Sequence, residues 1–195
     1  MKVYKATDAD MSCHRGKGVF PYELGVTAYA DKSKCGETGL HACEYVLDCV
    51  RYYSLDRGHR FFLAEASGDI AEDGSNTRIS CTELTLIKEL SNRDIAREAL
   101  LYMKHHPKRD GWKISTSGIM VAEDEAWCGN EGGIAIARGR NPRVKGGIGA
   151  YLGLIQETKK GIVAVNLFTV DGPILPDTWY TLDALMDAFE KGGAA

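Results

Sequence analysis

Hydrophobic and polar positions along the first half of the chain predict a short succession of strands and helices. Residues 2–6 read as an opening strand, residues 60–66 alternate as a half-buried strand does, and a further strand is expected over 78–86. Apolar residues at helical spacing predict a helix over 44–53. The clearest helical pattern covers 92–106, because Ser91 can cap its first turn and Pro107 must end it.

The second half has a different texture. Residues 114–152 are small and glycine-rich, and a Gly-Ile pair recurs at 118, 133 and 147, with spacings of 15 and 14 residues. This period suits the rungs of a short β-solenoid, although ordinary glycine-rich hairpins would also explain it. A hairpin is expected over 150–170, with its turn at 159–161. A C-terminal amphipathic helix is expected from about 182 to 189.

Together these elements predict an α+β fold in two parts. An N-terminal α+β unit is expected over residues 1–110. A β-rich unit is expected over residues 111–195, with solenoid-like rungs, a hairpin and the terminal helix. The exposed edges of such rungs could also pair with a second copy of the chain, which would make a homo-oligomer.

Composition narrows the class of protein. The 195 residues are 44% hydrophobic, enough to bury a core, and the net charge of −3 with a pI near 6.0 lacks the basic excess of a dedicated nucleic-acid binder. No apolar run approaches the ~20 residues that cross a bilayer, and the N-terminus has no hydrophobic leader. We therefore expect a soluble cytoplasmic protein without membrane contact, in which the six cysteines are reduced.

Soft metal ligands are concentrated in the first 43 residues. Cys13, Cys35, His41 and Cys43 could supply a tetrahedral Cys₃His site for zinc, and a strand at 41–43 would place two of them on one face. The spacing contains no C-x₂-C knuckle, so the alternative is that the cysteines pack as small hydrophobes and no cofactor is bound. Cys43 before a helix, with His41 or His14 as base, could also act as a nucleophile.

A basic, glycine-containing stretch near residue 140 is the second candidate site. We expect a loop here that contacts phosphate, nucleic acid or an acidic protein surface through backbone N–H groups and cations. It is not a P-loop, because G-x-x-x-x-G-K-[ST] is absent, and a solvated turn is the alternative. The candidate binding residues are Arg138, Arg140, Arg143, Lys145, Gly146 and Gly147.

Several segments resemble an uncharacterised family of phage and prophage proteins. They include Gly39-Leu40-His41-Ala42-Cys43-Glu44, a following helix that ends in Tyr52-Tyr53, and a closing segment around Pro176-Asp177-Thr178-Trp179-Tyr180. Members of that family carry Gly/Ala-rich tandem repeats, for which this chain has only the degenerate stretch 114–149. The resemblance implies a binding protein that acts on a host or phage macromolecule, protein or nucleic acid, in an infected or lysogenic bacterium. Counter-defence of the anti-CRISPR kind would be one such role.

An enzymatic alternative comes from a looser resemblance. Tyr4-Lys5 on a first strand, followed by a loop, Gly39-Leu40-His41, a helix and a strand, is similar to the order of elements in ADP-ribosyltransferases. This resemblance implies an NAD-using enzyme with a cleft in the N-terminal half. Those enzymes usually carry Arg or His where this chain has Lys5, and no catalytic glutamate can be assigned.

Overall fold

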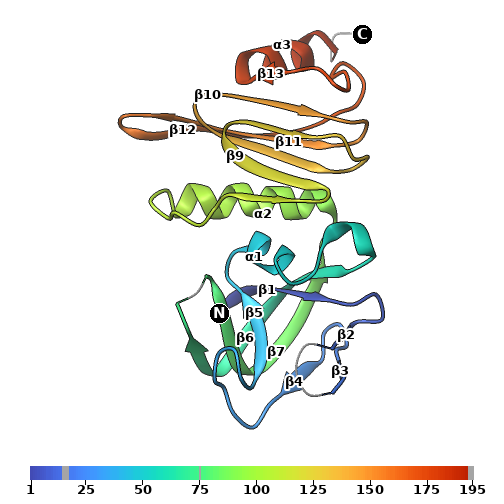
Figure 1. Cartoon of the computed structure of the whole chain (residues 1–195), viewed down its shortest axis with the longest axis vertical. Helices are drawn as coiled ribbons and strands as arrows, with labels where there is room; N and C mark the ends of the chain where they lie inside the picture. The colour runs from blue at the N-terminus through green and yellow to red at the C-terminus, as the bar shows by residue number, and fades with distance from the viewer. Residues whose placement is uncertain (15–17, 75, 193–195) are drawn as a thin grey trace. The chain divides into compact units, whose positions relative to one another are not determined.

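The computed structural model describes residues 1–14, 18–74 and 76–192, and the chain forms two compact units, Met1–Ser91 and Asn92–Ala195 (Figure 1). The expected α+β class is confirmed, with β-sheets dominating both units. The boundary lies at 91/92, whereas the sequence pattern suggested 110/111. The physical reason is that the helix following Ser91 packs against strands of the second unit.

The first unit is built on a small antiparallel sheet. Its order is β4-β7-β5-β1-β6, and β6 also pairs with β7, so β1, β6, β7 and β5 form a closed ring. Closure leaves these four strands without a free edge along the paired segments. The strands are β1 (Lys2–Thr7), β2 (Ser12–Cys13), β3 (Phe20–Pro21), β4 (Thr27–Tyr29), β5 (Leu40–Cys43), β6 (Arg60–Glu72) and β7 (Arg78–Glu89).

Alternating residues of these strands fill the ring. Val3, Ala42, Phe62 and Ile79 belong to one buried apolar cluster, as the period of two along a strand requires. The predicted helix over 44–53 is present but shorter, as α1 (Val46–Val50), followed by a single 3₁₀ turn, η1 (Leu55–Arg57).

The second unit contains a sheet in which neighbouring strands follow one another along the chain. The order is β12-β11-β10-β9-β8, and β13 pairs with β10. β9, β10 and β11 are parallel, while β8 and β12 pair antiparallel at the two ends. The strands are β8 (Ile114–Thr116), β9 (Ile119–Cys128), β10 (Ile134–Gly146), β11 (Tyr151–Thr158), β12 (Gly161–Thr169) and β13 (Tyr180–Thr181).

The first two units of the predicted repeat are stacked parallel strands, β9 and β10. Ile119 pairs with Ile134 across β9 and β10, at the expected spacing. The third strand starts at Tyr151, which pairs with Ile134. The prediction of a third unit at Ile148 is wrong, because residues 147–150 form a turn closed by the Ala150 N–H donating to the Gly147 carbonyl at 3.1 Å. Ile148 is left exposed in that turn.

Two helices cover the second sheet. α2 (Asn92–His105) turns Ile95, Ala99 and Met103 inward and packs against β10, β11 and β12, while α3 (Leu182–Gly192) follows β13 and lies on the other face (Figure 1). The predicted 150–170 hairpin is confirmed as β11 and β12. Within the described residues, neither these helices nor α1 combine the length and apolar character that crossing a bilayer demands.

Candidate ligand-binding pocket

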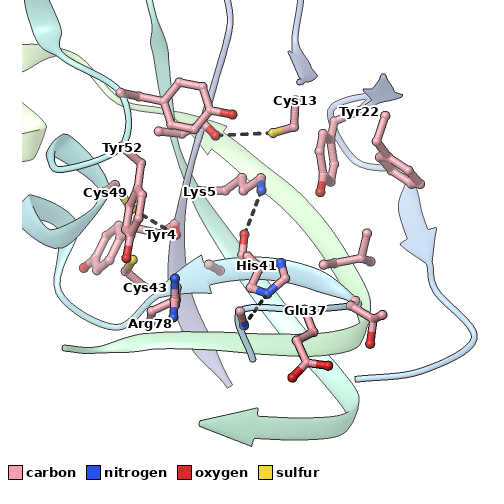
Figure 2. Close-up of a pocket in the computed structure, with 18 of the residues that line it drawn as sticks. Tyr4, Lys5, Cys13, Tyr22, Glu37, His41, Cys43, Cys49, Tyr52 and Arg78 are labelled. Atoms are coloured by element: carbon pink, nitrogen blue, oxygen red, sulfur yellow. Dashed lines mark hydrogen bonds between the residues drawn. The ribbon is translucent and has the colours of Figure 1, made fainter. Parts of the chain in front are cut away.

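The first unit contains a pocket of about 910 Å³, within the range of small-molecule sites. Its walls come from β1, β5, the start of β7, the loop before β5, the β2–β3 segment and the region of α1, so residues far apart in the sequence meet there. Figure 2 shows the polar and aromatic side chains that line it. They include Tyr4, Lys5, Cys13, Tyr22, His41, Cys43, Cys49, Tyr52 and Arg78.

Lys5 reaches the pocket because β1 and β5 separate beside it. These two strands pair only at Tyr4 and Cys43, whereas β1 pairs with β6 along its whole length. In the gap, Lys5 Nζ donates to the His41 carbonyl oxygen of β5 at 2.7 Å (Figure 2). A side chain therefore connects the two strands where the backbone ladder is interrupted.

The charge on Lys5 is buried among neutral groups. Its side chain is almost wholly enclosed, and its neighbours besides the His41 carbonyl are the Tyr22 phenol and the Cys13 thiol. Burial acts to lower the pKa of the ammonium, but contacts with Tyr22 and Cys13 act to raise it, and the net shift is upward. Across the part of the chain that the structure describes, no carboxylate pairs with this cation.

Aromatic rings form much of the pocket wall. Lys5 Nζ lies 5.0 Å from the centre of the Tyr22 ring, which in turn lies 5.0 Å from the ring of Phe20. Burial raises the pKa of the Tyr22 phenol, so this ring is neutral near pH 7 and does not neutralise Lys5. On another side of the pocket, Tyr4 and Tyr52 add two further rings.

Arg78 brings a second cation to the wall. Its guanidinium is paired with Asp73 and stands 5.9 Å from the ring centre of Tyr52. The hydrogen bond that Arg78 donates to the Asp73 carboxylate raises the pKa of Arg78 above its usual value, so it is charged at all ordinary pH values. Its buried Nε has no hydrogen-bond partner among the described residues.

His41 lies between these cations as a neutral ring. Burial, with the nearby charges of Lys5 and Arg78, lowers the pKa of its imidazole below 6.5. The Gly36 backbone N–H donates to His41 Nε2 at 3.0 Å, so Nε2 must carry the lone pair (Figure 2). Protonation would break this hydrogen bond and place a third positive charge beside the pocket.

This arrangement makes stability depend on pH. The His41 contribution is fully present above about pH 6.5, the pKa of an unfolded histidine, and it is lost as the pH falls through the lower folded pKa. Replacing His41 by glutamine should therefore reduce the loss of melting temperature between pH 8 and pH 5. Thermal unfolding followed by circular dichroism at both pH values measures this difference.

His105, exposed at the end of α2, provides the control. Its replacement by glutamine should leave the pH dependence close to that of the unchanged protein. An equal acid sensitivity in the His41→Gln variant and the unchanged protein would contradict the assigned pKa direction.

The cysteines of the expected zinc site make separate contacts. Cys13 Sγ donates to the Ala6 carbonyl at 3.7 Å, and Cys35 Sγ donates to the Arg78 carbonyl at 3.5 Å. With His41 Nε2 held by Gly36, these groups do not converge. No group of three His, Cys, Asp or Glu side chains suited to a metal ion occurs in the described ranges, so this geometry lends no support to the zinc prediction.

Cys43 lies at the end of β5, and α1 begins three residues later at Val46. It shares a hydrogen bond with Cys49, and this contact together with burial raises the pKa of the Cys49 thiol well above its usual value. Cys49 Sγ also lies 3.3 Å from the Tyr4 carbonyl oxygen, to which it donates. Both thiols are buried, which fits the interpretation of reduced cysteines packed as small hydrophobes.

The basic stretch of the second unit is not a loop, contrary to expectation. Arg138 through Gly146 belong to β10, and Gly147 begins the turn that follows. Arg138 is buried and donates to Glu157 Oε1 at 2.6 Å and to the Pro107 carbonyl at 2.5 Å, so it acts as an internal ion pair. Gly146 accepts from the Asp177 N–H at 2.8 Å, while Gly147 N–H donates to the Cys128 carbonyl at 2.9 Å.

The remaining cations of that stretch lie on the outer face of β10. Arg140 is exposed, Arg143 pairs with Glu125 at 2.6 Å, and Lys145 lies beside Trp127 and Trp179. These residues stay together, but the backbone groups expected to hold an anion are occupied by protein partners.

Sequence reasoning found part of the pocket. His41, Cys43 and Cys13 were singled out by residue type, and the two resemblances drew attention to Lys5 and Tyr52. Tyr22 and Arg78 have no local pattern that marks them. Lys5 carried one usable signal, because a lysine at an inward position of a buried strand is costly unless its charge has a use.

One comparison with known proteins gives a match. A family model described as a domain of unknown function, DUF7666, matches residues 1–98, which include every residue of the pocket. No curated protein and no solved structure matches the chain.

Proposed function

We propose, from the premise that this chain belongs to the DUF7666 family of unknown function, that its N-terminal unit binds a small anionic ligand with an aromatic group, of the nucleotide class. The observation that carries the proposal is the charge of Lys5, which is buried at the pocket without a carboxylate partner among the described residues. Burial of an unpaired charge is unfavourable in an empty pocket, and a bound anion would compensate it.

The rest of the pocket supports the nucleotide class over a simple inorganic anion. Its volume of about 910 Å³ is far larger than a phosphate ion needs. The rings of Tyr4, Tyr22 and Tyr52 offer flat apolar surfaces for a base, while Lys5 offers positive charge for a phosphate group, beside the Arg78 guanidinium that is paired with Asp73. A ligand with both parts uses both kinds of wall.

Calorimetric titration of the full chain with ADP tests the proposal. ADP should bind, and adenosine or inorganic phosphate should each bind at least about tenfold more weakly, since each lacks one half of the recognised chemistry. Absence of ADP binding would contradict the proposal. Equal affinities for adenosine and ADP would exclude an anion site at Lys5.

An NAD-using enzyme is the second candidate, because the pocket lies in the N-terminal half and is lined by Lys5, His41 and Glu37. In such a reaction the bond between the ribose and nicotinamide breaks, nicotinamide leaves with the electron pair, and water or an acceptor bonds to the ribose carbon and releases a proton to solvent. Incubation with NAD followed by chromatography for free nicotinamide distinguishes the candidates. Release at a rate proportional to protein concentration favours the enzyme, and binding without release favours the binding protein.

The biological setting is proposed from the sequence resemblance. We place the chain among phage and prophage binding proteins that act in a bacterial host, with counter-defence as the role. The match to a family of unknown function is compatible with that assignment and does not specify it. Purification of the tagged chain from its native host, with analysis of both bound small molecules and proteins, addresses the partner directly.

A further inference from the structure

The outer face of β9 and β10 displays aromatic and basic side chains. Ala126 and Val144 point into the core of the second unit, so their neighbours along each strand point outward. The register pairs Trp127 with Lys145 and Glu125 with Arg143. Trp179 joins them, since it directly precedes β13, the strand that pairs with β10.

These side chains form a continuous surface, the Trp–Lys face, defined as Trp127, Arg143, Lys145 and Trp179. Lys145 Nζ lies 5.9 Å from the ring centre of Trp127 and 5.4 Å from that of Trp179, so it stands between two indoles. Arg143 Cζ lies 4.8 Å from the centre of the Trp179 ring. The cations and rings therefore alternate across neighbouring strands.

Trp127 is the least expected member of this face. It exposes 54% of its surface, although a tryptophan on a strand normally covers part of a core. Its neighbour Lys145 makes no ion pair with any described carboxylate. An exposed indole beside an unpaired ammonium offers stacking and charge to a partner at the same time.

We propose that the Trp–Lys face binds single-stranded nucleic acid without sequence preference. Successive unpaired bases can stack on the indoles, while the phosphates between them meet Lys145 and Arg143. A duplex hides its base faces, and the overall charge of −3 provides no broad basic surface for its phosphates. This site belongs to the second unit and does not depend on the function proposed for the pocket.

Fluorescence anisotropy with labelled oligothymidine and oligouridine of ten to twelve nucleotides, within the site sizes of about 4–16 nucleotides of other single-strand binders, tests the proposal. The full chain should bind both, with a duplex of equal length bound at least about tenfold more weakly. Among the described residues Lys145 has no carboxylate partner and Arg143 is paired with Glu125, so the slope of log K against log salt should lie between about −0.7 and about −1.4, at about −0.7 for each neutralised phosphate.

Matched variants assign the binding to this face. Trp127→Ala should weaken binding about tenfold, because one stacked base is worth roughly 5- to 150-fold in affinity, and Trp127→Phe should recover part of the affinity. Lys145→Gln should weaken binding and make the salt slope shallower. Phe189→Ala, an equally exposed aromatic on α3, and Lys159→Gln, an exposed lysine in the β11–β12 turn, should change neither quantity.

Three results would overturn the proposal. The first is that neither single strand binds at low salt, and the second is that duplex and single strand bind equally. The third is unchanged binding by a folded Trp127→Ala variant that has the circular dichroism spectrum of the unchanged protein. Binding of an acidic peptide or a soluble glycan in place of the oligonucleotides would assign the face to a different partner.

Discussion

Replacing Lys5 by methionine should weaken ADP binding at least about tenfold, the loss expected when one charge-assisted contact to a phosphate is removed. Methionine keeps the length and unbranched shape of the side chain, so the pocket retains its walls. Adenosine, which has no phosphate, should bind both proteins with similar affinity. Calorimetric titration with the two ligands separates a charge effect from a general loss of the pocket.

Controls for this prediction come from the same strand. Lys2→Met removes an equal charge from an exposed position of β1 outside the pocket and should leave ADP binding unchanged. Lys5→Gln keeps a donor near the His41 carbonyl without the charge, so it should preserve folding and still lose affinity. Unaltered ADP binding by folded Lys5→Met and Lys5→Gln variants would refute the anion site.

Replacing Gly147 by alanine should lower the free energy of unfolding of the second unit by about 1–3 kcal/mol, the usual cost of forcing extra atoms into a packed position. An added Cβ would lie 2.5 Å from the Gly129 carbonyl oxygen, and both are backbone positions that cannot rotate away. The melting temperature should fall by about 4–8 °C for each kcal/mol lost. Calorimetric unfolding of the full chain measures the shift.

Gly129 is the matched control, because it lies in the same contact and its own Cβ would meet nothing within 4 Å. Gly129→Ala should therefore have a melting temperature close to that of the unchanged protein. Equal melting temperatures for the two variants would show that the turn can relax around Gly147. Glycine would then not be needed there for close packing.

The separate elements were largely predictable from local patterns. The periods of 2 and 3.6 in hydrophobicity identified β1, β6, β7, α2 and α3, because a strand or helix that buries one face must repeat at those intervals. The spacing of Ile119 and Ile134 identified two stacked strands, because a repeat of fixed length places equivalent residues side by side. The short strands β2, β3 and β4 are too brief for any period to be visible, and no element was predicted at their positions.

The candidate site was only partly predictable. His41 and Cys43 attracted attention through residue type, but their expected zinc chemistry depends on which atoms converge, and each side chain found a different partner. The sequence predicted Arg138 on an exposed contact surface. In the structure, the carboxylate of Glu157, nineteen positions later, holds Arg138 inside the second unit. Such partners are set by strand pairing, which a single sequence does not display.

The sequence by itself determined the α+β class, the main helices and strands and the family to which the first 98 residues belong, because these depend on local periodicity and on residue identity. Only the tertiary structure decided which side chains share a pocket. The separation of β1 from β5 lets the buried Lys5 side chain reach the pocket, closure of the ring brings Arg78 of β7 beside β5, and the segment after β3 supplies Tyr22. Long-range strand pairing supplies that information, since it joins residues whose distance along the chain is unrelated to their distance in space.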